Sequence, residues 1–163
     1  MTQIKELREK TSAGVMECRN ALQEADADLE KVCELLRERG LAKAEEKKDR
    51  VTSQGLIEAY VHVGGRIGAM VEVNCETDFV AKTNEFKTLA HDLVLQVAAA
   101  DPQYVSAEEM PEGEGLNPEE VCLLEQPFIK DESRKVKQLV TETAAKTGEN
   151  VRIKRFARFR LGE

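Results

Sequence analysis

The period of the apolar residues changes from helical to alternating near Leu56 of this 163-residue chain, and that change limits the folds it can adopt. Before Leu56 the apolar residues recur at helical spacing. Beyond it they alternate with polar residues over two successive runs, as in half-buried strands. The sequence therefore predicts an α+β fold, in which an N-terminal helical module precedes a small antiparallel sheet covered by further helices.

The N-terminal module is predicted to contain three short helices within residues 3–39. Residues 11–14 separate the first two helices, and residues 25–28 offer N-cap candidates for the third. Gly40 is expected to cap the C-terminus of the third helix, so the module spans residues 1–40. Its apolar positions are Ile4, Leu7, Met16, Ala21, Leu22, Ala25, Leu29, Val32, Cys33 and Leu36.

Residues 41–54 are expected to form a helical or mobile linker, because the stretch up to Arg50 is rich in Ala, Lys and Glu and has little to bury. The linker leads into an α/β core domain over residues 55–163. Within that domain, residues 107–120 combine glutamates with prolines and glycines, which indicates an acidic surface loop. We assign no function to this acidic loop.

The first two strands are predicted at residues 56–63 and 67–73. A two-residue turn at residues 64–65 would place their apolar sets on opposite faces of the sheet. We therefore expect a three-residue loop over residues 64–66 that pairs Val63 with Ile67. The buried face would then consist of Ile57, Ala59, Val61, Val63, Ile67, Ala69, Val71 and Val73.

Three further helices are expected after these strands. Thr77 can cap a short helix through about Lys82, and Thr83 can cap a longer one that ends at residues 101–102. The third is expected from about Glu132 to Lys146, ending at Gly148. We expect these helices to cover the sheet.

The chain is predicted to finish with a strand that has one apolar and one basic face. Phe156 is the exception on the basic face. An aromatic residue there either anchors a partner or packs under the acidic loop. The apolar face would carry Val151, Ile153, Ala157, Phe159 and Leu161, and the basic face Arg152, Lys154, Arg158 and Arg160.

The charge and the apolar runs limit the classes of partner. A formal charge of −7 argues against nucleic acid and favours a protein partner. The basic residues near positions 43–50 and 152–160 form either solvated faces or partner contacts. No apolar run approaches the roughly 20 residues that span a bilayer, and the first residues resemble no targeting segment. We therefore expect no membrane contact and a cytoplasmic location.

The four cysteines lack the spacing of a zinc site and are expected to be free thiols, so no metal or cofactor is predicted. An enzyme would need Cys75 or Cys18 as nucleophile and His62 or His91 as base. The sequence has no Gly-rich phosphate loop or other catalytic motif, and surface histidines are the simpler interpretation. We predict that the chain is not an enzyme.

Four segments carry a resemblance to a known family. Residues 71–81, VEVNCETDFVA, resemble the central signature of elongation factor Ts. Residues 7–22, LREKTSAGVMECRNAL, resemble the family's N-terminal signature, which includes a three-helix bundle similar to ubiquitin-associated (UBA) domains. Residues 126–128 and 148–151 resemble further family segments. The resemblance covers nearly the whole chain.

The chain also departs from the family pattern. Ser12 stands where the family usually has Gly, and Val15 where Met is common. Long members of the family repeat the α/β unit and carry a helical coiled-coil insertion, whereas this chain has one unit and a short acidic loop. It resembles a short form, and for short forms the resemblance implies a homodimer.

The resemblance implies that the chain is a guanine nucleotide exchange factor. Its partner would be elongation factor Tu, in the GDP-bound and nucleotide-free states, and its effect would be to promote GDP release. Thr77, Asp78, Phe79 and Val80 match the family's nucleotide-release segment. Phe79 would wedge beside the nucleotide site, and Asp78 would help to shift the elements that order Mg²⁺ and phosphate. From the residues alone, Asp78 could instead complement a helix N-terminus, with Phe79 in its own core.

A second partner surface is implied at the turn into the second helix. Arg8, Val15, Met16 and Arg19 match positions that the family uses to hold the GTPase domain. Val15 or Met16 could equally belong to the bundle core, although adjacent residues on a helix cannot both face inward, so one of them is expected to be exposed. The alternative function is a UBA-type protein-binding module on an unrelated scaffold, without exchange activity.

Overall fold

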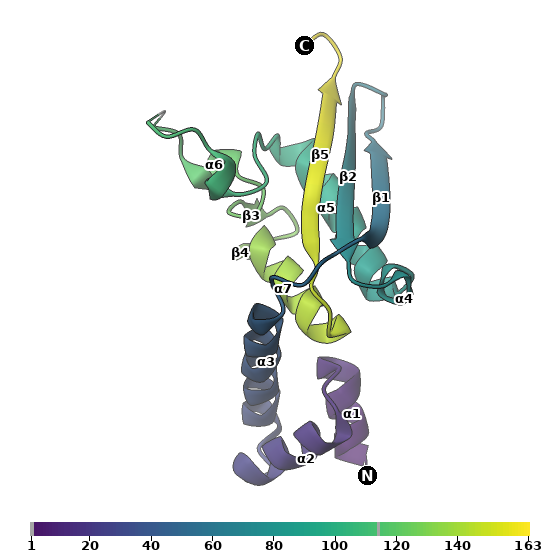
Figure 1. Ribbon diagram of the computed structural model, residues 1–163, viewed down its shortest axis with the longest axis vertical. Coiled ribbons are helices and arrows are strands. Elements are labelled where there is room, and N and C mark those ends of the chain that lie inside the picture. Colours follow the sequence, from purple (N-terminus) through teal and green to yellow (C-terminus); the bar gives the residue numbers. More distant parts are fainter. Residues whose placement is uncertain (1, 114) are drawn as a thin grey trace.

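The computed structural model describes residues 2–113 and 115–163, with three helices at one end and a sheet with further helices at the other (Figure 1). The sheet has three antiparallel strands. The α+β fold class is therefore confirmed. Met1, in the predicted N-terminal module, and Glu114, in the acidic loop, lie outside the described residues.

The N-terminal helices are α1 (Thr2–Thr11), α2 (Val15–Glu24) and α3 (Leu29–Glu46). The Asp28 side chain accepts the backbone N–H groups of Glu30 and Lys31 and so caps α3, within the expected segment. Met16, which the sequence placed among the apolar positions, is 61% exposed and does not belong to the core. The buried cluster consists of Leu7, Cys18, Ala21, Val32 and Leu36.

Gly40 does not cap α3, contrary to expectation, because the helix continues through it to Glu46. Beyond Gly40, α3 packs against α7 (Val136–Thr147), and Ala44 is buried in the larger core. The contact with α7 stabilises the helical conformation of residues 41–46, although their composition provides few apolar side chains to bury. The division of the chain into domains at residues 40 and 54 stays a prediction.

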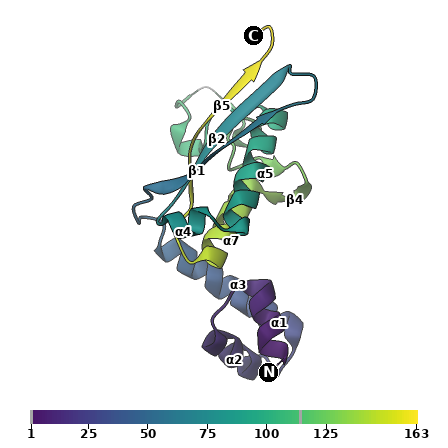
Figure 2. The same cartoon turned by 90° about the vertical axis from the view of Figure 1, so that its right-hand side faces the viewer.

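The sheet consists of β1 (Gln54–Val61), β2 (Ile67–Cys75) and β5 (Arg152–Arg160), in the order β1-β2-β5. Helix α5 (Asn84–Ala100) runs along one face of the sheet, and the opposite face carries no helix among the described residues (Figures 1 and 2). Thr83 caps α5, as expected. Strands β1 and β5 both lie at edges.

The pairing of β1 with β2 differs from the expected register by one residue. Val61 pairs with Gly68, and the His62 N–H donates to the carbonyl of Ile67 at 2.8 Å, so the loop has four residues, 63–66. Gly64 and Gly65 both adopt positive φ angles, which permits this longer turn.

This register exposes the residues that were expected to be buried in the first strand. Odd-numbered residues of β1 lie opposite even-numbered residues of β2, so Ile57 and Val61 are exposed on the open face. Leu56 and Tyr60 pack against the core instead. The exposed large apolar residues in and near these strands are Ile57, Val61, Val63 and Met70.

A β-bulge reverses the faces of β5 halfway along the strand. Val73 pairs with Ile153, whereas the preceding Glu72 pairs with Arg155, so β5 contains one extra residue. Phe156 consequently packs against the core, and Phe159 is 73% exposed. The expected apolar face and the role of Phe156 as a surface anchor are therefore both wrong.

The expected helix from Glu132 begins later than predicted. Residues 131–135 form β4 (Asp131–Lys135), which pairs with β3 (Pro127–Phe128), and α7 begins at Val136. Gly148 ends α7 with a φ of 74°, as expected. The acidic loop contains a 3-10 turn at Ala107–Glu109 and the beginning of α6 (Pro118–Val121).

Candidate functional site

The turn after β2 presents an aromatic side chain to solvent. Thr77 closes the turn as the N-cap of α4 (Asp78–Ala81), as expected. Phe79, the second residue of α4, is 78% exposed, whereas Val80 is buried against the core. Phe79 therefore does not pack into the chain's own core. The buried side chain of Val80 instead holds this helical turn against the core.

Asp78 lies beside Phe79 and is paired within the same short helix. Its Oδ2 accepts a hydrogen bond from Lys82 Nζ at 2.7 Å. The Lys82 ammonium holds the pKa of the Asp78 carboxyl below its usual value. Asp78 is therefore an ionised, half-buried carboxylate at the first position of a helix. This geometry agrees with the alternative in which Asp78 complements a helix N-terminus, and it leaves the carboxylate next to Phe79.

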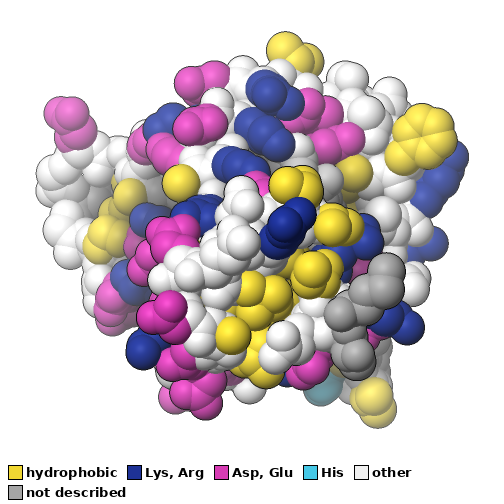
Figure 3. Space-filling view, turned by 90° about the horizontal axis from the view of Figure 1, so that it is seen from below, with side chains coloured by type: hydrophobic (Ala, Val, Ile, Leu, Met, Phe, Trp, Pro, Cys, Tyr) yellow, Lys and Arg dark blue, Asp and Glu magenta, His cyan; other side chains and the backbone are white. Residues whose placement is uncertain are grey.

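The four predicted docking residues come from α1 and α2 and are all exposed. The sequence required only one of Val15 and Met16 to be exposed. In the structure both are exposed, because the fully buried residues of α2 are Cys18 and Ala21. Arg8 and Arg19 take part in no ion pair among residues 2–113 and 115–163. Figure 3 shows apolar side chains at the surface of this end of the molecule, surrounded by charged ones.

The carboxylate of Glu17 fixes the direction of α2 because it binds both Gly14 and Lys43. Glu17 Oε2 accepts the Gly14 N–H at 3.0 Å, and the same carboxyl forms an ion pair with Lys43 of α3. The hydrogen bond with Lys43, and then that with Gly14, hold the pKa of Glu17 below its ordinary value. These contacts orient the exposed start of α2, which carries Val15 and Met16, relative to α3.

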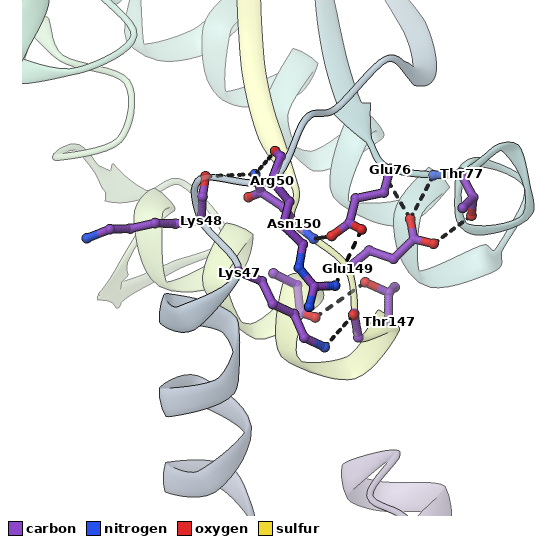
Figure 4. Close-up of polar contacts among 10 residues, drawn as sticks. Lys47, Lys48, Arg50, Glu76, Thr77, Thr147, Glu149 and Asn150 are labelled. Carbon is purple, nitrogen blue, oxygen red and sulfur yellow. Dashed lines mark hydrogen bonds and ion pairs between the residues drawn. The ribbon is translucent and has the colours of Figure 1, made fainter.

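Sequence analysis missed the polar contacts behind the Phe79 turn. Glu149 and Asn150, at the turn between α7 and β5, bind the backbone around Thr77 and the connection that follows α3 (Figure 4). For residues 148–151 the sequence predicts only a helix end at Gly148, a strand residue at Val151 and the resemblance to a family segment. Glu149 and Asn150 directly follow the glycine that ends α7, but this local pattern does not indicate that Asn150 is buried or which distant groups the two residues bind.

Both histidines and Cys75, which an enzyme would need, have other hydrogen-bond partners in the structure. His62 Nδ1 is 2.9 Å from the Tyr60 hydroxyl, and His91 Nδ1 is 3.1 Å from Glu58 Oε1. The Cys75 thiol donates to the carbonyl of Thr77 at 3.1 Å, and burial raises its pKa to about 11. Neither histidine is therefore positioned to activate Cys75.

Two further features of the described residues concern metals and membranes. No group of three or more His, Cys, Asp or Glu side chains in residues 2–113 and 115–163 is arranged to hold a metal ion. Within the same part of the chain, no helix is both long and apolar enough to cross a bilayer.

The chain matches a family model described as "Elongation factor TS" over residues 2–115 and 116–163. It is 50% identical to elongation factor Ts of Carboxydothermus hydrogenoformans, over 98% of this chain and 88% of that relative. The values are the same for elongation factor Ts of Heliobacterium modesticaldum. For elongation factor Ts of Finegoldia magna the identity is 48%, with the same coverage.

These alignments contain more positions than the chain has residues. They extend over 190 positions for the first two relatives and 198 for the third, against 163 residues here. The relatives therefore carry residues that this chain lacks. The match to the family model is divided between residues 115 and 116, within the acidic loop.

Proposed function

The chain belongs to the elongation factor Ts family, and from this premise we propose how its exposed surfaces act on elongation factor Tu. It is a guanine nucleotide exchange factor that promotes GDP release from elongation factor Tu during translation elongation. The alternative, a UBA-type binding module on an unrelated scaffold, is not favoured, because the relatives match the α/β core as well as the three helices.

We propose that the exchange rests on differential binding. A factor that binds nucleotide-free elongation factor Tu more tightly than the GDP-bound form weakens GDP binding by the same free energy. Each tenfold change in this coupling requires about 1.4 kcal/mol. Burying one Phe side chain in an apolar pocket contributes about 1.5–3 kcal/mol. A single exposed aromatic side chain can therefore account for a large part of the effect.

The observation that best supports a release segment at residues 77–80 is the exposure of Phe79. An exposed Phe at the start of a helix, held by the Thr77 cap and by buried Val80, is rigidly presented for insertion into a partner. We propose that Phe79 enters beside the nucleotide site and that Asp78 displaces the groups that order Mg²⁺ and phosphate. Loss of the Mg²⁺ bridge then loosens GDP.

We propose that Arg8, Val15, Met16 and Arg19 dock the factor onto the GTPase domain. The support is their common exposure on α1 and α2 and the lack of ion pairs at both arginines within the described residues. Apolar side chains flanked by unpaired arginines are typical of the energetic centre of an interface.

We further propose that the factor is a homodimer in which the open faces of two sheets meet. Two-fold association would bury a surface that each copy leaves exposed. The apolar character of the open sheet face supports this proposal, since large exposed apolar patches are rare on monomers. The patch comprises Ile57, Val61, Met70 and Phe159, which pairing and exposure place on that face.

We propose that exchange proceeds without covalent chemistry by this chain. The buried Cys75 thiol with its raised pKa and the two histidines with other partners support this proposal. A cytoplasmic site of action, supported by the role of the family in translation, also stays a proposal.

Release of a fluorescent GDP analogue from elongation factor Tu tests the proposed function. The release rate should rise with the concentration of the chain and reach a plateau. Excess unlabelled GDP prevents rebinding of the analogue, and a reaction without the chain gives the spontaneous rate. A rate that stays at the spontaneous value over a large excess of folded chain would disprove exchange activity.

A further inference from the structure

Three segments that are distant in the sequence meet directly behind the Phe79 turn. They are the connection after α3 (residues 47–50), the turn between β2 and α4 (residues 76–77) and the turn between α7 and β5 (residues 148–150). Figure 4 shows Glu149 and Asn150 between the other two segments, bonded largely to their backbone groups. We call the contacts of Glu76, Thr77, Glu149 and Asn150 the polar junction.

Glu149 holds the backbone of the turn with both of its carboxylate oxygens. Its Oε2 accepts the N–H groups of Glu76 and Thr77 at 3.1 and 3.0 Å. Its Oε1 accepts the Thr77 hydroxyl at 2.6 Å. Hydrogen bonds to an ionised acceptor are stronger than neutral ones, so these three fix the position of two consecutive residues.

The contact with the hydroxyl also orients the cap of α4. A threonine hydroxyl has one hydrogen to donate, and Thr77 directs it to Glu149. Its lone pairs are then available to the Val80 N–H, at a long 3.5 Å. Glu149 therefore acts through Thr77 on the first turn of the helix that carries Phe79.

The opposite side of the polar junction holds the backbone that leads from the N-terminal helices. Asn150 is buried, and its side-chain amide donates to the carbonyls of Lys48 and Arg50, both at 2.8 Å. Its backbone N–H donates to Glu76 Oε1 at 2.7 Å, and Arg50 lies 3.6 Å from the other oxygen of Glu76. Two adjacent residues thus connect the Phe79 turn to the end of α3.

We propose that Glu149 and Asn150 are positioning residues that set the place of Phe79 relative to the docking surface on α1 and α2. This inference rests on the proposed roles of those two surfaces. Two sites on one rigid partner are engaged together only when the distance and orientation between them are correct. The polar junction holds the release segment and the connection to the docking helices in one network.

The test is the concentration dependence of GDP release with Glu149→Gln. This substitution preserves size, but it removes the charge and replaces the acceptor that faces the Thr77 hydroxyl. We expect the plateau rate to fall roughly tenfold, within the range of couplings between neighbours in one hydrogen-bond network, whereas the half-saturating concentration changes less than twofold. Asp92→Asn, which neutralises a carboxylate of α5 paired with Lys130, is the matched control and should keep the wild-type rate.

A second variant addresses the other half of the polar junction. Asn150→Asp retains the side-chain shape but removes both N–H donors to the Lys48 and Arg50 carbonyls. The plateau rate should fall here too, while circular dichroism shows a folded chain. If Glu149→Gln does not fold, Asn150→Asp carries the test alone.

Combination with Phe79→Ala separates positioning from general damage. If Glu149 acts through Phe79, the double variant should release GDP no more slowly than Phe79→Ala alone. Additive losses, or a wild-type plateau in folded Glu149→Gln and Asn150→Asp, would overturn the positioning role. A wild-type rate for Phe79→Ala would overturn the release segment as well, whereas a slow Phe79→Ala beside normal junction variants would overturn the positioning role only.

Discussion

Gly40 of α3 lies directly against Ala145 of α7, so that a Cβ atom added to Gly40 would be 3.3 Å from the Cβ of Ala145. That separation is tighter than ordinary van der Waals contact, and it shows how closely the two helices approach. The contact joins the N-terminal helices to the α/β core.

Gly40→Leu is expected to destabilise the chain by about 1–3 kcal/mol, because the larger side chain must push α3 away from α7. Urea unfolding followed by circular dichroism measures the change. Glu38→Leu places the same side chain at an exposed position of α3 and serves as the control. Equal unfolding midpoints for the two variants would mean that the helices have room to separate.

Phe79→Ala should fold normally and release GDP roughly ten- to a hundredfold more slowly at saturation, the equivalent of losing about 1.5–3 kcal/mol of apolar burial in the partner. The side chain is exposed in the free chain, so its removal leaves the core intact. Val51→Ala truncates another strongly exposed apolar residue, outside the proposed surfaces, and should keep the wild-type rate. Unchanged release by folded Phe79→Ala would remove Phe79 from the mechanism.

Arg19→Ala should raise the half-saturating concentration about fivefold to tenfold and affect the plateau rate less, because Arg19 is assigned to docking. Titration of GDP release with increasing factor distinguishes the two parameters. Arg66→Ala, in the loop between β1 and β2, removes an exposed arginine far along the chain from the docking helices. A lower plateau with unchanged half-saturation would assign Arg19 to nucleotide release instead.

Phe159→Asp should convert the proposed dimer to monomers at micromolar concentration, because it places a charge within the proposed apolar contact. Sedimentation equilibrium gives the mass directly. Val63→Asp changes an exposed apolar residue in the four-residue loop, outside the paired strands, and should leave the mass unchanged. A wild-type chain that is monomeric throughout, yet fully active, would exclude a functional requirement for the dimer.

Alkylation at pH 8 should modify Cys33 well before the other thiols. Cys33 is half-buried, whereas Cys18, Cys75 and Cys122 are buried and burial raises their pKa values, to about 11 for Cys75. The thiolate is the reactive form, so these thiols react slowly until the chain opens. Mass spectrometry after timed quenching measures the order. Labelling of Cys75 as rapid as that of Cys33 would contradict the buried, protonated state.

The features that the sequence predicted correctly are those determined by near neighbours. Asp28, Thr77 and Thr83 cap helices because each side chain bonds to a backbone group two or three residues away. Gly148 ends α7 because it adopts a left-handed conformation. The exposure of Phe79 and of the docking residues is consistent with the roles proposed for them.

The features that the sequence did not predict depend on distant residues. The sequence predicts a helix end at Gly40, but in the structure the absence of a side chain there allows α3 to pack closely against Ala145 of α7. The strand register depends on whether three or four residues form a loop, which two glycines permit equally. The polar junction joins residues about 74 and 100 positions apart, and no local pattern identifies such pairs.

The β-bulge in β5 determines how many positively charged side chains lie on the open face of the sheet. If β5 alternated regularly, Lys154, Arg158 and Arg160 would lie on the same face as Arg152. Two copies that met through this face would then repel each other, because each would present a row of positive charges. The extra residue instead directs Arg158 inward, where it lies 3.2 Å from Asp101, and turns Ala157 and Phe159 outward. One extra residue thus reduces the like charge on the face through which we propose that two copies associate.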